Sequence, residues 1–279
     1  MFEVLVFMAP AICMCLILVA ICGYVGVHVI MREVIFIDIS LAQISALGAS
    51  VSLLIGLELG EVRTCLISLA VTFLGAVLLS STGRLKKIVP QEAFIGILYA
   101  VGSAGTLLVG DRLAHGSEHV KELMYGHLLW TNWKEIGFHC IVYACLGLVY
   151  WLIHAKLLVL SEKKDHGKKG KRGDVWWEFL FYALLGVLVT FAVRVAGVLL
   201  VFGFLIVPAA IGTLLVKSFF GRLIVGWVTG ILVSILGTYL SYVMDFPTGA
   251  VIVVSLGLCL LVIAFLKAML LKRARVPVK

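Results

Sequence analysis

Charge is scarce in this chain. Asp, Glu, Lys and Arg make up 14% of the 279 residues, whereas a soluble domain carries about 25%. Hydrophobic residues make up 62% and the mean hydropathy is +1.15, so there is too little polar surface to cover a water-soluble globule. Disorder is excluded as well, because disordered chains combine high charge with low hydrophobicity. The composition therefore indicates an integral membrane protein.

Several catalytic motifs are also missing. The chain has no GxxxxGK followed by Ser or Thr to hold nucleotide phosphates, and Lys217-Ser218, the nearest approach, lacks the preceding glycines. It contains neither HExxH nor GxSxG. Its seven cysteines form no CxxC pair and most lie in apolar runs, which is typical of core residues. We expect a protein that is not an enzyme and holds no stably bound cofactor.

What is present is a series of long apolar runs, which predicts an all-α, polytopic transmembrane helical bundle forming a single domain over 1–279. A span needs roughly 20 apolar residues, and the candidates are 5–30, 35–56, 64–81, 93–110, 136–160, 176–195, 197–216, 222–243 and 248–270. Only Ala196 and its neighbours separate the sixth and seventh candidates, so these are two spans or one broken unit, and the total is 8–9. Pro208 predicts a kink or break in mid-span. Glu3 occupies the place of a basic signal-peptide region, so the first run is expected to be a span.

The net charge of +8 is distributed as the positive-inside rule requires rather than as a nucleic-acid face. Basic residues lie near Arg32, at 83–87, in the loop 161–175, around Lys217 and Arg222, and in the tail 271–279. Nine spans place all of these on one side and the acidic external loop 111–135 on the other. We therefore expect an external N-terminus, a cytoplasmic C-terminus and no nucleic-acid partner.

Three segments resemble one family. These are GYVGVHVIMREVIFIDISLAQISALG at 23–48, the stretch from EAFIGILYAVGSAGTLLVGD to ELMYGHLL at 92–129, and RVAGVLLVFGFLIVPAAIGTLL with GTYLSYVMDFPTGAVIVV at 194–254. They are similar to the permease subunits of ABC importers for zinc and manganese, the metal ABC transporter permease family. The last segment is the most specific, and the resemblance covers most of the chain.

The resemblance implies a type II ABC importer permease in the bacterial inner membrane, working by alternating access as a homodimer. It implies a cytoplasmic ATPase subunit that binds ATP, an external solute-binding protein, and a divalent metal cargo, zinc or manganese and possibly iron. The basic loop falls where this family contacts its ATPase, so the candidate contacts are Lys163, Lys164, Asp165 and Lys168. A solvated anchor loop is the alternative, because charge runs often serve only orientation.

The second span departs from the family pattern. Many members carry an aspartate and, four residues later, a histidine, whereas this chain has Asp38 and, five residues later, Gln43. Five residues turn the two side chains about 140° apart on a helix. Asp38 is a candidate for the translocation path and for metal binding, because ionisable residues in spans usually face a polar cavity or a partner. The alternatives are a cap or a salt bridge to Arg32 or Arg194, and for Gln43 a hydrogen bond between helices.

Other candidates lie towards the external side. His115 and His119 share a face if their segment is helical and are candidate metal ligands, or are ordinary surface residues. Asp245 lies at the expected outer opening, where turn formation before Pro247 explains it equally well. Arg194 is expected to snorkel or to pair with Asp38 or Asp245. His127 is expected to make a structural hydrogen bond.

Two other functions fit parts of the sequence. An ABC permease for a metal chelate or a vitamin would share this architecture, and the replacement of histidine by Gln43 leaves that possibility open. A proton-coupled secondary carrier would need acids in mid-span, and Asp38 lies near one end of its run.

Overall fold

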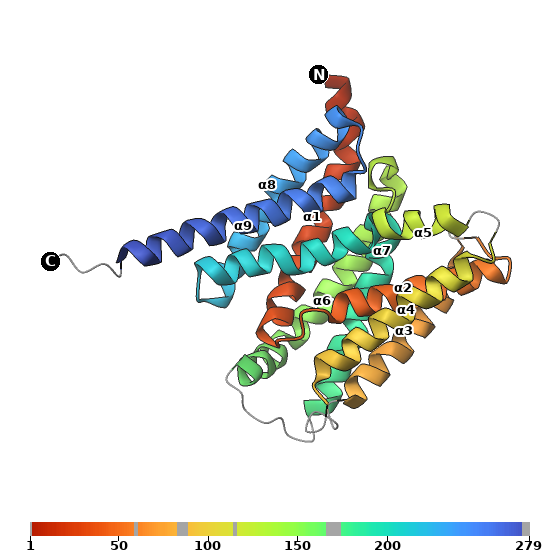
Figure 1. Cartoon of the computed structure of the whole chain (residues 1–279), viewed down its shortest axis with the longest axis horizontal. Helices are drawn as coiled ribbons and strands as arrows, with labels where there is room; N and C mark the ends of the chain where they lie inside the picture. Colours follow the sequence, from red (N-terminus) through yellow and green to blue (C-terminus); the bar gives the residue numbers. More distant parts are fainter. Residues whose placement is uncertain (1, 59–60, 83–88, 114–115, 166–173, 275–279) are drawn as a thin grey trace.

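A computed structural model describes residues 2–58, 61–82, 89–113, 116–165 and 174–274 of the chain, and this part is helical apart from its connectors (Figure 1). The elements are α1 (Phe2–Met31), α2 (Ile37–Leu54), α3 (Val62–Thr82), α4 (Gln91–Gly110), α5 (Gly116–Tyr125), the 3-10 turn η1 (Leu128–Trp130), α6 (Trp133–Asp165), α7 (Asp174–Leu215), α8 (Phe219–Met244) and α9 (Thr248–Ala274). Eight of them, all except α5 and η1, are long and apolar enough to cross a membrane. The all-α polytopic bundle expected from the sequence is confirmed.

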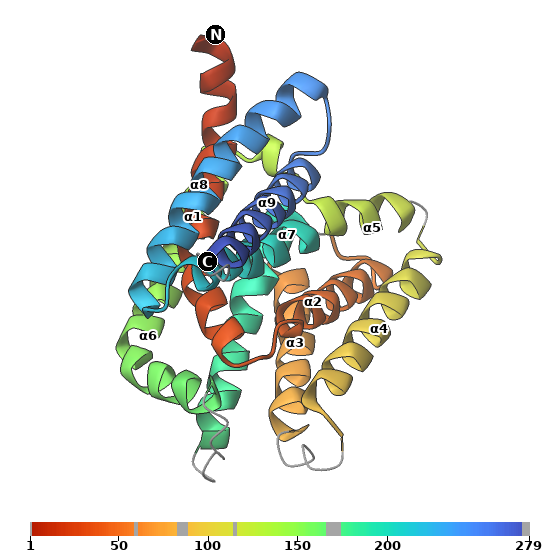
Figure 2. The ribbon, with the colours of Figure 1, turned by 60° about the vertical axis from the view of Figure 1, so that its left-hand side comes forward.

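The helix α7 lies at the centre of the bundle. It packs against α1, α2, α3, α8 and α9, and it lies between a group formed by α2, α3 and α4 and a group formed by α1, α6 and α8 (Figure 2). Its side chains Phe181, Tyr182 and Phe204 are among the largest that are fully buried. By contrast, only 22% of the α4 span and 17% of the α9 span are buried, which leaves apolar surface for lipid or another subunit.

A break at Gly197 divides α7 into two arms. The Phe181 ring in the first arm lies 6.5 Å from the His28 ring, and Phe219, just beyond the second arm, lies 4.9 Å from it. Both ends of α7 therefore lie near the same point on α1. We call this the Arg32 end of the bundle. The opposite end, where α7 turns, we call the Gly197 end. The sixth and seventh predicted spans are the two arms of this one broken helix.

The position of the break corrects one expectation. We expected Pro208 to kink or break its helix, but the non-helical residue within α7 is Gly197, with φ 77° and ψ 160°. Side chains other than hydrogen are strained at such dihedrals. Pro208 stays in the second arm, where its carbonyl faces Gly226 of α8.

The turn also depends on close backbone packing. A Cβ atom on Gly197 would lie 2.5 Å from the amide nitrogen of Gly126, which itself has a positive φ of 68°. The next residue along, His127, donates its backbone N–H to the Val195 carbonyl at 3.0 Å. The external loop predicted at 111–135 therefore contains ordered helices, and its second half is fixed to the break in α7.

Replacing Gly197 with alanine is expected to destabilise the protein. The strained dihedrals alone cost about 1–3 kcal/mol, and the new Cβ would overlap the backbone of Gly126 and Met124. Thermal unfolding of the purified protein should show a lower midpoint for Gly197→Ala. Gly137→Ala is the matched control, because no atom lies within 4 Å of a Cβ there. Equal midpoints for the two variants would contradict the described turn.

Candidate translocation path

The first turns of α2 carry polar side chains with no hydrogen-bonding partner. Asp38, Ser40 and Gln43 are 1%, 0% and 2% exposed. Among the described residues, no hydrogen bond of regular geometry reaches either carboxylate oxygen of Asp38, Ser40 Oγ or Gln43 Oε1, and the Asp38 carboxylate has only weaker contacts with the backbone N–H groups of Asp38 and Ile39. Buried polar atoms without partners are rare in folded proteins, and an ionisable group inside a span is a functional candidate. We call these three residues the α2 oxygen row.

The row does not converge on one point. Asp38 lies within electrostatic range of Cys22 of α1. Gln43 packs against α4, where a Cβ on Gly102 would lie 2.9 Å from the Gln43 carbonyl carbon. The five-residue spacing accounts for this divergence, because it turns the two side chains about 140° apart. Within the described part of the chain, no three His, Cys, Asp or Glu side chains are grouped to hold a metal.

Asp38 has no ion-pair partner among the described residues, so the salt bridges to Arg32 and Arg194 considered above do not form. Arg32 turns away from it. The Arg32 Nε donates to Ser161 Oγ at 3.0 Å, and the guanidinium lies 4.0 Å above the Phe181 ring. Burial lowers the pKa of Arg32, and the charges of Tyr182 and Glu178 oppose this shift.

A cavity of about 580 Å³ opens near the Gly197 end, between α3, α5, α6 and α7. Its lining includes three acids, two imidazoles and one guanidinium: Glu61, Glu122, Glu135, His127, His139 and Arg194. We call this space the outer cavity, because the charge distribution of the sequence predicts that this end of the bundle is external. Arg194 therefore lies beside the cavity acids rather than beside the α2 oxygen row, and it has an interaction partner of its own.

Of the two imidazoles of the outer cavity, that of His139 is oriented by a backbone carbonyl. The Nδ1 atom of His139 lies 2.8 Å from the Glu135 carbonyl oxygen, and its Nε2 has no hydrogen-bond partner in the described part of the chain. That arrangement is common for histidines that bind metals through the other nitrogen. His127 Nδ1 lies 3.8 Å from Glu122 Oε1. His127 Nδ1 has no hydrogen-bond partner in the described part of the chain, and the hydrogen bond that this residue donates to Val195 comes from its main chain.

The remaining candidates are placed as follows. Asp245 is exposed and ends α8 in a left-handed conformation, which agrees with a role in the turn. His119 lies in α5, but its side chain is outside the described residues, as is all of His115. Lys163, Lys164 and Asp165 form the last turn of α6, with side chains outside the described set, and Lys168 lies wholly outside it.

Most of the residues that line the outer cavity were not predicted from the sequence. Asn132 and Glu135 form a reciprocal cap at the start of α6, with N···O distances of 3.2 and 3.0 Å. The Asn-x-x-Glu pattern before an apolar run is a readable signal for such a cap, and His139 follows one turn later. For Glu61 and Glu122, the sequence predicted only the side of the membrane on which they lie. Their place in one cavity could not be predicted, because only the folded chain brings them together.

Known proteins resemble this chain over most of its length. The sequence profile of the ABC 3 transport family matches residues 4–268. The manganese transport system membrane protein MntB of Synechocystis is 32% identical over 183 residues, covering 64% of this chain and 58% of that protein. A probable metal transport system membrane protein of Chlamydia muridarum is 21% identical over 252 residues, covering 90% and 84%.

Two solved structures share the fold. One is PsaBC from Streptococcus pneumoniae in complex with Fab, with a TM-score of 0.73, 22% identity, and coverage of 92% of this chain and 90% of that chain. The other is an inward-facing putative metal-chelate type ABC transporter, with a TM-score of 0.70, 20% identity, and coverage of 92% and 85%. The chain thus shares its fold with PsaBC and with this ABC transporter, and it belongs to the ABC 3 transport family.

Proposed function

We propose that this chain is the permease of an ATP-driven importer and carries a divalent transition metal across the bacterial inner membrane. The α2 oxygen row is the observation that carries the proposal, because it leaves buried polar atoms unpartnered inside a membrane span. The relatives support the cargo class, since they include manganese and iron transport system membrane proteins. Manganese, iron and zinc are the candidate metals.

The chemistry of the row fits a passing cation rather than a resident one. Carboxylate and amide oxygens suit hard divalent cations such as Mn²⁺, whereas imidazole and thiolate suit softer ions. Three residues that do not converge bind weakly, and a transported ion must bind loosely enough to leave. Asp38 supplies the charge of this path and Gln43 a neutral oxygen at the next position.

The outer cavity extends this reading to the external side. Its carboxylates and the free Nε2 of His139 are positioned to attract a cation before it enters the membrane. His115 precedes α5 and His119 lies within it. Both remain candidates for metal capture on the same side of the membrane. Asp245 remains a candidate at the outer opening.

The partners follow from the family. We infer a homodimer, an external solute-binding protein, and a cytoplasmic ATPase subunit that hydrolyses ATP. The ATPase would contact the end of α6 and the basic loop, through Lys163, Lys164, Asp165 and Lys168. Alternating access would then move the helices around α2, so that the oxygen row opens to each side in turn.

A metal chelate is the second candidate cargo. One relative is the chelated iron transport system membrane protein YfeC of Yersinia pestis, 27% identical over 163 residues. The absence of a cluster of three ligands from the described residues favours a cargo that brings its own ligands. A proton-coupled carrier has less support, since the family is one of ABC transporters.

We infer that the Gly197 end is external and the Arg32 end cytoplasmic. In a cysteine-free background, Glu58→Cys should react with a membrane-impermeant maleimide in intact cells, because Glu58 is exposed beside the outer end of α2. Lys217→Cys, exposed between α7 and α8 at the other end, should react only after permeabilisation. The reverse pattern would contradict the orientation.

Metal uptake tests the function directly. Proteoliposomes with the chain, its ATPase and its binding protein should take up Mn²⁺, Fe²⁺ or Zn²⁺ only with ATP inside. Asp38→Ala should reduce uptake tenfold or more, equivalent to about 1.4 kcal/mol in the barrier. The His115→Ala/His119→Ala variant tests capture at the outside. If the intact complex takes up no metal when ATP is present, the proposed metal cargo is wrong and a metal chelate is favoured.

We expect the Asp38 side chain to lower the stability of the folded protein, although it contributes to transport. Asp38→Leu removes a buried carboxyl group with no partner, so its unfolding midpoint should equal or exceed that of the wild type. Ser161→Ala is the contrasting variant, since it leaves His28 Nδ1 and Arg32 Nε without their partner. It should cost about 1–3 kcal/mol. A large loss of stability in Asp38→Leu alone would indicate a structural role for Asp38.

A further inference from the structure

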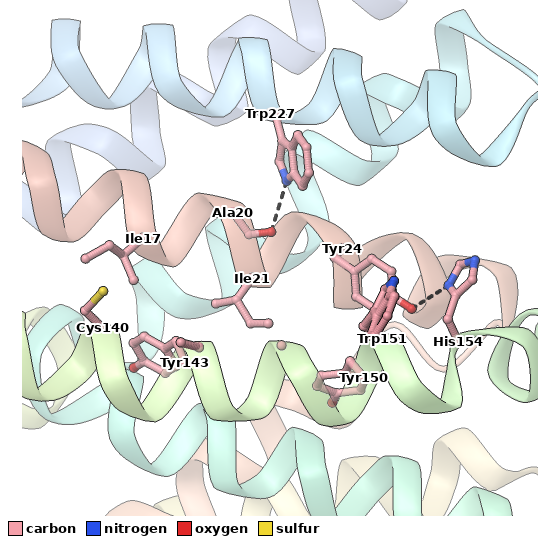
Figure 3. A pocket seen from close by; sticks show the side chains of 12 residues that line it. Ile17, Ala20, Ile21, Tyr24, Cys140, Tyr143, Tyr150, Trp151, His154 and Trp227 are labelled. Atoms are coloured by element: carbon pink, nitrogen blue, oxygen red, sulfur yellow. Dashed lines mark hydrogen bonds between the residues drawn. The ribbon is translucent and has the colours of Figure 1, made fainter.

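A second cavity lies on the side of the bundle, away from the α2 oxygen row and the outer cavity. It measures about 430 Å³ and is lined by α1, α6 and a single residue of α8 (Figure 3). We call it the lateral slot. Its walls are almost wholly apolar and aromatic, and nothing in the proposed transport path uses them.

The slot is long and narrow. Its lining runs along α6 from Cys140 to His154, which at 1.5 Å per residue is about 21 Å. Its volume is several times smaller than that of a helix of the same length. A helix with its side chains is about 10–12 Å across, so the slot is too narrow for a helix of a second subunit. A single hydrocarbon chain fits this shape.

The slot is built by small residues and closed by aromatic ones. Gly147 leaves its centre open, because a Cβ there would meet only Ile21 Cδ1, at 3.9 Å. From the α8 side, the Trp227 indole N–H donates to the Ala20 carbonyl at 3.0 Å and fixes that wall (Figure 3). Trp151, which is 72% exposed, stands at the rim.

The membrane around the lateral slot and the polar residues at one of its ends indicate what kind of molecule occupies it. All three helices are membrane spans, so the slot borders hydrocarbon, and an empty groove would forfeit dispersion contacts. Towards the Arg32 end the slot finishes at a polar pair, Tyr24 OH and His154 Nδ1, 2.7 Å apart. The polar tips of these two side chains suit the headgroup region of a lipid rather than its hydrocarbon chain.

We propose that the lateral slot binds one acyl chain of a membrane phospholipid, with the headgroup at the end formed by Tyr24 and His154. The chain lies against Gly147 between α1 and α6, and the Trp151 and Trp227 rings cover it. This site is separate from the metal path and does not depend on which cargo the permease carries.

Photo-crosslinking tests the proposal on the assembled transporter. The probe is phosphatidylglycerol with a diazirine in one acyl chain, in vesicles of phosphatidylglycerol and phosphatidylethanolamine. Mapped by mass spectrometry, the label should concentrate on the slot peptides of α6 around Gly147 and of α8 around Trp227. Label spread evenly over the exposed faces of α4 and α9 as well would show bulk lipid only and overturn the proposal. No label at the slot, with label elsewhere, would show that a protein subunit covers it and would also overturn it.

Two matched variants make the test specific. Gly147→Phe fills the slot, so label there should be lost, whereas Gly137→Phe adds the same ring on the same helix where no atom lies within 4 Å. Label retained in Gly147→Phe at the level of Gly137→Phe would contradict the site. If Gly147→Phe does not assemble, Ala144→Leu replaces it, and loss of label at the slot is judged against the label map of the wild-type protein.

Discussion

The close approach of three glycines holds the Gly197 end of the bundle together. Gly126, Gly197 and Gly249 bring the end of α5, the turn of α7 and the start of α9 within backbone contact of one another. In a membrane, an irregular segment is tolerated only where its polar groups are satisfied or buried in protein. The bond from His127 N–H to Val195 O meets this requirement. The two arms of α7, and with them the core, depend on this junction.

The α2 oxygen row shows the opposite condition, polar groups left unsatisfied in the same apolar interior. Stability would favour apolar residues at Asp38, Ser40 and Gln43, since a buried polar atom without a partner is costly. Their presence is therefore best explained by transport. Arg32 and His28 share Ser161 as a partner, although His28 Nε2 and both terminal guanidinium nitrogens of Arg32 are also buried without a hydrogen-bond partner in the described part of the chain.

The features that depend on composition and on the helical period were predicted from the sequence. Run lengths predicted the spans, and the separation at Ala196 predicted a broken sixth unit, because both follow from local hydrophobicity. A second break or kink was expected at Pro208, but the non-helical residue of α7 is Gly197, whose turn is stabilised by a contact with Gly126 that is distant in sequence. The Asp38–Gln43 divergence followed from helical period alone. The outer cavity did not, because Glu61, Glu122 and His139 meet only through the packing of four helices.

The contacts of Arg32 have a mechanical consequence. This residue lies six positions before Asp38 and is bound both to Ser161, near the end of α6, and to Phe181, near the start of α7. The two helix ends that flank the basic loop are thus clamped to the short connector that leads into α2. A displacement of either helix end must carry the connector with it or break the clamp, and because His28 of α1 also bonds to Ser161, the end of α1 and the start of α2 are both coupled to that displacement.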